Sequence, residues 1–339
     1  MLRYFFTFTA GAIASTIVFF SLSLLDSSPD SVFASPEASA AAKAMREQMA
    51  PHVIDLMTGD MEERRALLNE VFFAPRIAEA RELYPATEEV LDIDGVYTEV
   101  FKPAGGVPEE NAGRVLINLH GGGFMFGART EGRLESIPLA NVAGMKIVSV
   151  DYRQGPEHTF PAASEDVATV YRHLLKSHAP EQIGIFGCSA GGILTAQSVA
   201  WFAAHNLPQP GAIGIFCAGA GMVGIGDSAV ISDTFGTNIG SGGEMPYFEG
   251  ADMQDPLVSP LHHPEVMAQF PPTLVITSTR DLAMSTGLAT HQALVAQGVP
   301  SELHVYEGLI HYWYADTGLP ESRHAFNVMA NFFDRHLSR

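Results

Sequence analysis

The chain has 339 residues, of which 47% are hydrophobic. This length suits one large α/β domain or two small ones, and the composition allows a sizeable buried core. Its formal net charge is −19, which argues against nucleic-acid binding, because that function needs clustered Lys and Arg to displace counterions from phosphates. The two cysteines, Cys188 and Cys217, have neither the number nor the spacing of a zinc site or a disulfide framework. Cys217 is expected to be a buried free thiol.

The N-terminus carries a long apolar segment. Residues 5–25 contain no charged side chain, and they follow Arg3 and precede Asp26. This pattern predicts a signal peptide or signal anchor over residues 1–26, with membrane anchoring through the apolar residues, since about 20 such residues span a bilayer. The charge asymmetry predicts that the rest of the chain lies outside the cytoplasm, in the periplasm, the cell envelope or the medium. Whether the segment is cleaved stays open.

A linker and then helices are expected before the first strand. Residues 27–42 are rich in Ser, Pro and Ala and predict a linker, so the folded domain is expected over residues 43–339. Apolar residues recur at helical spacing over about 43–84 and predict amphipathic helices. Asp94-Gly95 predicts a hairpin turn between two strands, at 88–93 and 97–102.

After the hairpin, short apolar strands alternate with helices. This alternation predicts an α/β fold class with a mostly parallel central sheet flanked by helices. The Gly-rich segment 219–250 is too long for an ordinary connection and predicts an insertion over the active site. The expected strands are 115–119, 146–151, 183–186, 212–217, 273–278 and 302–306, and the expected helices are about 134–143, 162–177, 191–205, 285–297 and 322–336.

The sharpest motif is Gly-Cys-Ser-Ala-Gly-Gly at 187–192, between an expected strand and an expected helix. This context is that of a G-x-S-x-G nucleophile elbow, in which a sharp turn lifts the Ser189 hydroxyl above the sheet at a helix N-terminus. Gly187 and Gly191 remove the Cβ atoms that would clash where helix and strand approach. Cys188 lies beside the nucleophile, so a cysteine nucleophile is not expected.

A second G-x-S-x sequence occurs at 226–229, but Val230 stands where the second glycine is needed. Ser228 is therefore interpreted as a loop serine without a catalytic role.

The segment His120-Gly121-Gly122-Gly123 follows the expected strand at 115–119. Three glycines let backbone N–H groups approach a substrate closely, as an oxyanion hole requires. A phosphate-binding loop is the alternative, and it is disfavoured because no Gly-Lys-Ser/Thr follows. His120 itself is expected to anchor the loop.

A nucleophilic serine needs a base and an orienting carboxylate, which follow it in the order acid and then His on this type of elbow. Asp281 follows the expected strand 273–278, and His311 follows the expected strand 302–306. Asp281 could also be only a helix N-cap. The joint placement of both residues in the required order predicts a triad of Ser189, Asp281 and His311.

Taken together, the chain from about Val96 to Arg339 resembles the hormone-sensitive-lipase-like family of α/β-hydrolase-fold esterases. The motifs that carry the resemblance are His120–Gly123, Asp151-Tyr152-Arg153 with Pro156-Glu157-His158 and Pro161-Ala162-Ala163, Gly187–Gly192, Asp255-Pro256-Leu257 with Ser259-Pro260, and Glu307-Gly308 with His311.

The resemblance implies an oxyanion hole from the backbone N–H groups of Gly122, Gly123 and Ala190, and it implies Asp281 and His311 as triad partners. It also implies a helical cap from about 43–85 and 219–265, and hydrolysis of short acyl esters with no cofactor and no metal.

The sequence departs from the family at three places: Cys188 stands where Asp is usual, Leu282 where Pro is usual, and Tyr312-Trp313 follow the histidine. The last two side chains either narrow the acyl pocket or pack in the core.

The function expected is therefore a serine carboxylester hydrolase that acts on a small-molecule ester through an acyl-enzyme. Lactone or amide hydrolysis, or acyl transfer, on the same triad is an alternative, because all share the tetrahedral intermediate. A non-catalytic small-molecule binder on the same fold is another. The sequence leaves the acyl length and the oligomeric state open.

Overall fold

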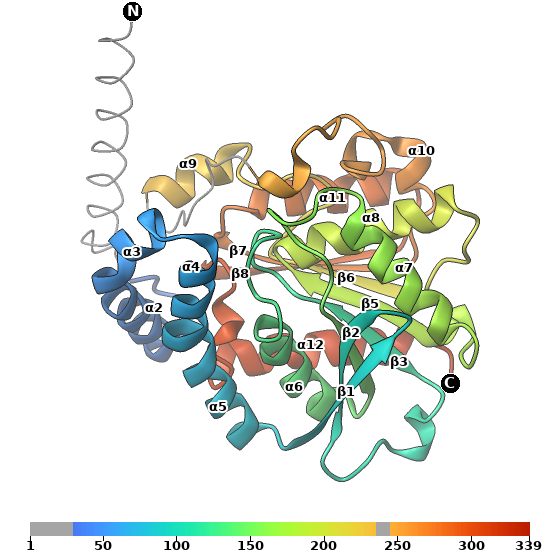
Figure 1. Cartoon of the computed structure of the whole chain (residues 1–339), viewed down its shortest axis with the longest axis horizontal. Helices are drawn as coiled ribbons and strands as arrows, with labels where there is room; N and C mark the ends of the chain where they lie inside the picture. The colour runs from blue at the N-terminus through green and yellow to red at the C-terminus, as the bar shows by residue number, and fades with distance from the viewer. Residues whose placement is uncertain (1–29, 235–244) are drawn as a thin grey trace, which may run out of the picture.

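The computed structural model describes residues 30–234 and 245–339, and within them eight strands form one sheet with helices on both faces (Figure 1). The strand order is β1-β2-β4-β3-β5-β6-β7-β8. The strands from β4 onward along this order are parallel, whereas β1 and β2 are antiparallel to each other and β2 is antiparallel to β4. The predicted α/β fold with a mostly parallel sheet is confirmed.

The strands agree closely with the sequence-based expectations. They are β1 (Ala86–Ile93), β2 (Val96–Pro103), β3 (Val115–Leu119), β4 (Lys146–Val150), β5 (Ile183–Cys188), β6 (Ala212–Phe216), β7 (Thr273–Arg280) and β8 (Ser301–Ile310). The predicted hairpin joins β1 to β2, and Asp94 and Gly95 have φ angles of 52° and 91°, as a tight turn of positive φ requires.

Helices lie before the sheet and between its strands. They are α2 (Pro36–Met49), α3 (Val53–Thr58), α4 (Met61–Leu68), α5 (Ala74–Leu83), α6 (Glu131–Ala143), α7 (Ala162–Leu174), α8 (Ala190–Ala204), α9 (Asp227–Thr234), α10 (Pro264–Met267), α11 (Met284–Ala296) and α12 (Pro320–His336).

The two faces of the sheet bury separate hydrophobic cores. Side chains of α7, α8 and α11 cover one face, where Tyr171 stacks on Phe202. Side chains of α6 and α12 cover the other face together with α5, and Phe333 of α12 packs against Phe186 of β5. Because both faces are covered, a site is expected in the loops beyond the carboxyl ends of the parallel strands, where sheets of this type bind ligands.

The predicted linker over 27–42 is wrong from Pro36 onward, because α2 begins there. Ser35 caps the helix, since its side chain accepts a hydrogen bond from the Ala38 N–H, and Pro36 and Glu37 favour a first turn. The alanines that follow are strong helix formers, so the Ser, Pro and Ala content alone wrongly indicates a linker here. Ser35 also donates from its backbone N–H and its hydroxyl to Glu321 of α12, at 2.7 and 2.9 Å, which ties α2 to the sheet domain.

Within the described residues, no helix is long and apolar enough to cross a membrane. The apolar segment 5–25, for which a signal peptide or anchor is predicted, lies outside them, as do residues 235–244 of the predicted insertion.

Candidate active site

Ser189 lies at the turn between β5 and α8, where the motif predicts it. Its φ and ψ angles are 53° and −120°, a conformation that non-glycine residues rarely adopt. The backbone N–H of Ser189 donates to the Phe216 carbonyl of β6 at 2.8 Å, and the side chain is partly exposed. The hydroxyl is thus presented at the N-terminus of α8, where negative charge is favoured.

The glycines of this elbow are required by close packing. A Cβ on Gly191 would lie 1.7 Å from the Leu119 carbonyl oxygen, and one on Gly187 would lie 2.2 Å from the same atom. Real Cβ atoms do not approach so closely, so the end of β3 and the start of α8 meet only because both positions lack a side chain. The sequence-based reason given for these two glycines is confirmed.

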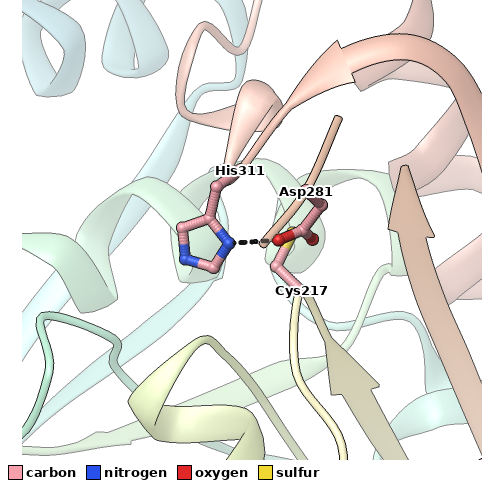
Figure 2. Close-up of side chains that lie close together, drawn as sticks. All are labelled: Cys217, Asp281 and His311. Carbon is pink, nitrogen blue, oxygen red and sulfur yellow. Dashed lines mark hydrogen bonds and ion pairs between the residues drawn. The ribbon is translucent and has the colours of Figure 1, made fainter. Parts of the chain in front are cut away.

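His311 and Asp281 form a hydrogen-bonded pair at the ends of β8 and β7. The Nδ1 atom of His311 lies 2.6 Å from Oδ1 of Asp281, and Figure 2 shows the imidazole ring directed at the carboxylate. Asp281 is fully buried, and its carboxylate also accepts the Ala283 N–H at 2.8 Å and the Thr277 hydroxyl at 3.1 Å. Asp281 therefore orients His311 and also bonds the turn that follows it. It is not the helix N-cap of the alternative interpretation, because Ala283 holds that position in α11.

The pair stabilises the charged form of each partner. Burial by itself raises the pKa of Asp281, but the charge and hydrogen bond of His311 together with the bonds from Ala283 and Thr277 outweigh it and lower the pKa. Burial lowers the pKa of His311, but the charge of Asp281 and its hydrogen bond to the imidazole outweigh burial and raise the pKa. The imidazolium that forms when His311 accepts a proton is therefore favoured here.

Cys217 lies beside this pair, one residue beyond β6 (Figure 2). Ligand atoms of Cys217, Asp281 and His311 all lie within 4.8 Å of one another. Thiol, carboxylate and imidazole are a donor set that suits zinc. However, the facing Nδ1 and Oδ1 atoms already bond each other, and burial raises the pKa of the Cys217 thiol to about 11. The arrangement is that of a hydrogen-bonded His–Asp dyad with a neutral thiol neighbour.

The predicted oxyanion groups lie at the carboxyl ends of the neighbouring strands β3 and β5. Gly122 and Gly123 follow β3 and have φ angles of 89° and 63°, and Ala190 is the buried first residue of α8. A Cβ on Gly122 would lie 2.3 Å from the Phe126 carbonyl oxygen. The loop can wind back on itself only because glycine stands there.

His120 anchors this loop, in agreement with its predicted role. Its ring is buried, stacks on Tyr152 with centroids 4.2 Å apart, and bonds the Gly121 carbonyl through Nδ1 at 2.9 Å. The Tyr152 hydroxyl in turn donates to the His120 carbonyl at 2.6 Å. Burial lowers the pKa of His120, so its neutral form is favoured.

Two side chains at the site were not found by sequence reasoning. Glu131, the first residue of α6, is buried against the oxyanion loop; α6 was expected to begin near Leu134, so its first turn was missed. Arg65 of α4 bonds the Met125 carbonyl of the loop at 2.8 Å, the Gly155 carbonyl at 2.8 Å and both carboxylate oxygens of Glu157. A contact between parts of the chain so far apart leaves no local signal in the sequence.

Ser228 is not a loop serine, so that interpretation is corrected. It lies in the first turn of α9, is fully buried, and donates from its hydroxyl to the Leu282 carbonyl at 2.8 Å. Its Oγ also accepts the Ser285 N–H at 3.1 Å. These bonds hold α9 against the segment that follows Asp281, and they give Ser228 a structural role.

The sequence allows two alternatives for Tyr312 and Trp313, which are narrowing of the acyl pocket and packing in the core. Trp313 is 4% exposed and packs in the core beneath α12, which favours the core alternative for that side chain. Tyr312 is partly buried, packs against the same core and has a left-handed backbone with φ of 57°.

Comparisons with known proteins agree with this geometry. A family model described as alpha/beta hydrolase fold matches residues 116–315. An acetyl-hydrolase of Streptomyces hygroscopicus is 29% identical over 66% of this chain and 77% of its own, and the esterase LipU of Mycobacterium tuberculosis is 28% identical over 72% and 86%.

Solved structures give the same result. The crystal structure of the esterase E25 matches with a TM-score of 0.76 and 32% identity, over 92% of this chain and 99% of that one. An esterase from the bacterial hormone-sensitive lipase family matches with a TM-score of 0.75 and 26% identity, over 90% and 99%. The chain therefore belongs to the hormone-sensitive-lipase-like family of the α/β-hydrolase fold, and it is an ester hydrolase.

Proposed function

We propose that the chain hydrolyses short-chain acyl esters through an acyl-enzyme on Ser189, with His311 as general base and Asp281 as its orienting carboxylate. The observation that carries this proposal is the 2.6 Å bond between His311 and the fully buried Asp281, at the end of the sheet that also carries the strained Ser189 turn. A buried carboxylate on Nδ1 leaves Nε2 of the imidazole as the atom that can accept a proton.

The chemistry balances in two steps. In the first, Oγ of Ser189 attacks the ester carbonyl carbon while His311 takes the hydroxyl proton, and the tetrahedral intermediate expels the alcohol, which receives that proton. In the second, His311 takes a proton from water as the water attacks the acyl carbon, and the acid leaves as Ser189 regains its proton. The backbone N–H groups of Gly122, Gly123 and Ala190 would bind the oxyanion in both steps, and losing one such donor costs about 3 kcal/mol.

The preference for short acyl groups rests on what similar proteins are called. Relatives include an acetyl-hydrolase and an acetyl esterase of Salmonella, which is 28% identical over 60% of this chain. The expected substrates are accordingly acetyl esters and esters of similarly short acids.

We further infer that the helices before β1, over about 43–85, form a cap together with the described parts of the segment 219–265, which are residues 219–234 and 245–265. Support comes from Arg65, through which α4 bonds both the oxyanion loop and the loop after β4.

The apolar residues 5–25 support our proposal that the chain lies outside the cytoplasm. Recovery of the chain from the cell-envelope fraction tests this location. N-terminal sequencing of the recovered material tests cleavage, which an intact Met1 end would contradict.

The test of the proposed function is release of p-nitrophenol from acetate, butyrate and longer acyl esters by the chain lacking residues 1–29. Ser189→Ala is expected to abolish release, and activity is expected to fall as the acyl chain lengthens. Ser228→Ala is the matched control, because this second serine is buried and hydrogen-bonded within the same fold. Loss of activity in the control but not in Ser189→Ala would contradict the assignment of the nucleophile.

The same preparations should be offered a lactone, an amide and a competing alcohol. Faster turnover of the lactone or the amide than of any ester, or transfer to the alcohol in preference to water, would contradict carboxylester hydrolysis as the main activity.

A further inference from the structure

The loop between β3 and α6 needs support that its own backbone does not supply. Five residues in it have positive φ angles, and two of these, Phe124 and Arg129, are not glycine. Such conformations cost free energy and persist only where surrounding groups impose them. The residues concerned are Gly122, Gly123, Phe124, Gly127 and Arg129.

The Glu131 side chain fills the space enclosed by this loop. An ideal Cβ on Gly121 would lie 2.2 Å from its Oε1, and one on Gly127 would lie 2.8 Å from its Oε2. Glu131 is 3% exposed, and its carboxyl group accepts a hydrogen bond from the Gly121 N–H. The backbone of Glu131 also bonds the loop, since its N–H donates to the Gly127 carbonyl at 2.9 Å.

Neighbouring groups contact Gly121 at its N–H, at its carbonyl and at its Cα. Its N–H faces Glu131, its carbonyl accepts from Nδ1 of His120, and the Cys188 carbonyl oxygen of the elbow lies 3.0 Å from its ideal Cβ position. The peptide that precedes Gly122 is thus fixed between the nucleophile elbow and a buried carboxyl group.

The start of α6 is itself fixed, so Glu131 has a rigid base. A Cβ on Gly132 would lie 2.3 Å from the Ser149 hydroxyl and 3.0 Å from the Asn118 side-chain oxygen, so the helix meets β3 and β4 at the closest approach that glycine allows. One turn later, Glu135 accepts a hydrogen bond from the Asn118 side chain.

We propose that Glu131 is a positioning residue for the oxyanion hole: its buried carboxyl group holds the Gly121 peptide and thereby aims the N–H groups of Gly122 and Gly123 at the substrate. This inference rests on the proposed function of these N–H groups. The Glu131 carboxyl group serves this role best when it is uncharged, because a negative carboxylate near the oxyanion hole would destabilise the negative charge of the oxyanion.

The surroundings favour such a neutral form. Burial raises the pKa of Glu131 to about 8, and the charge of His311 and the Gly121 hydrogen bond offset only part of this effect. Near neutral pH the side chain is therefore mostly a protonated acid. Glutamine has the same length, the same absence of charge and an oxygen that can accept the Gly121 N–H.

The test compares Glu131→Gln, Glu131→Ala and Leu134→Ala with the unchanged full chain, on p-nitrophenyl acetate. Glu131→Ala is expected to lower kcat at least about 10-fold, since loss of a whole oxyanion donor costs about 10²–10³-fold. KM is expected to stay within about twofold, because the interaction lost is made only in the transition state. Glu131→Gln is expected to keep most of kcat.

Affinity for a trifluoromethyl ketone, which forms a tetrahedral adduct with the serine, should fall in parallel with kcat in Glu131→Ala. Leu134→Ala is the matched control, because Leu134 is a fully buried residue of the same helix, in the core shared with α5 and α12, whose truncation lowers thermal stability. It is expected to lower the melting temperature and leave kcat and ketone affinity unchanged.

The proposal is overturned if Glu131→Ala keeps kcat and ketone affinity, if KM rises in place of a loss in kcat, or if Leu134→Ala loses as much kcat as Glu131→Ala. It is also overturned if Glu131→Gln is as impaired as Glu131→Ala. Ser189→Ala is run beside these variants: activity that survives in Ser189→Ala contradicts the proposed function, whereas normal Glu131→Ala kinetics with an inactive Ser189→Ala contradict only the role of Glu131.

Discussion

The nucleophile elbow and the oxyanion loop lie side by side, yet their strained backbones are held in different ways. At the elbow, glycines at 187 and 191 let β5, α8 and the end of β3 pack so closely that Ser189 has little freedom. In the oxyanion loop, buried polar side chains bond individual peptide groups, with His120, Tyr152 and Glu131 as the main contributors. Steric contact is all-or-none, whereas hydrogen bonds can be removed one at a time.

The largest expected effect comes from adding a single methyl group to the elbow. Gly191→Ala would place a Cβ 1.7 Å from the Leu119 carbonyl oxygen. The Cβ is fixed by the backbone and the oxygen belongs to it, so neither atom can rotate away from the other. The variant is expected to lose its cooperative thermal unfolding transition and all activity. Gly123→Ala is the matched control in the loop, since among the described residues nothing lies within 4 Å of its ideal Cβ. Its left-handed backbone should cost only about 1–2 kcal/mol. A folded, active Gly191→Ala would contradict steric control of the elbow.

The next largest effect concerns the dyad. Asp281→Asn keeps the shape but removes the charge that holds His311, and kcat is expected to fall about 10⁴-fold. Burial lowers the pKa of His311 but Asp281 raises it above its usual 6.5, so the unchanged enzyme should lose kcat/KM as pH falls through a value above 6.5. In Asp281→Asn, the midpoint of this fall in the residual kcat/KM should move to lower pH. An acid limb that does not move would show that another group titrates.

A third prediction uses the pH dependence of stability. The pKa of Glu131 is raised from 4.5 to about 8 in the folded chain, so the folded state binds an extra proton between these values and loses stability as pH rises through them. Glu131→Gln does not titrate. Its advantage in unfolding free energy over the unchanged chain should therefore grow from about pH 4.5 to about pH 8, by on the order of a few kcal/mol, and then level off.

Denaturant titrations of both chains at several pH values measure this difference. A constant difference across that range would contradict a buried, protonated Glu131.

The smallest expected effect concerns the contact between α4 and the oxyanion loop. Arg65→Met removes the hydrogen bonds from α4 to the Met125 carbonyl of the oxyanion loop and to Glu157. The solvent-screened pair with Glu157 is worth about 0–1 kcal/mol, and the bond to the loop carbonyl about 1.5–3 kcal/mol. Activity should fall several-fold at most, with a lower melting temperature. Arg81→Met breaks an exposed pair with Glu88 and is expected to cost about 0–1 kcal/mol with unchanged kinetics. Equal effects of the two changes would contradict a link between α4 and the loop.

How far the sequence predicts this molecule depends on whether the signal is local. Strands such as β3 and the glycines at 187 and 191 follow from apolar runs and a short motif, and both are found where they are expected. Asp281 and His311 were placed by chain order after strands, and the structure brings them together. Local capping chemistry at Ser35 was available in the sequence but was outweighed by composition, so the start of α2 was missed.

The remainder depends on long-range packing. Nothing near Glu131 in the sequence indicates that its carboxyl group meets Gly121, and nothing near Ser228 indicates that its hydroxyl meets Leu282. Both contacts arise where segments far apart in the chain are brought together by the sheet, and their burial decides the role of each side chain.

The most direct test of the central claim is to quench the reaction with p-nitrophenyl acetate by acid within the first turnover and to map the modified peptide by mass spectrometry. The account predicts one acetyl group on the peptide that carries Ser189, its formation at the rate of the first burst of p-nitrophenol, and its absence in Ser189→Ala. Full turnover without acetylation of Ser189, or acetylation at Ser228 in its place, would contradict it.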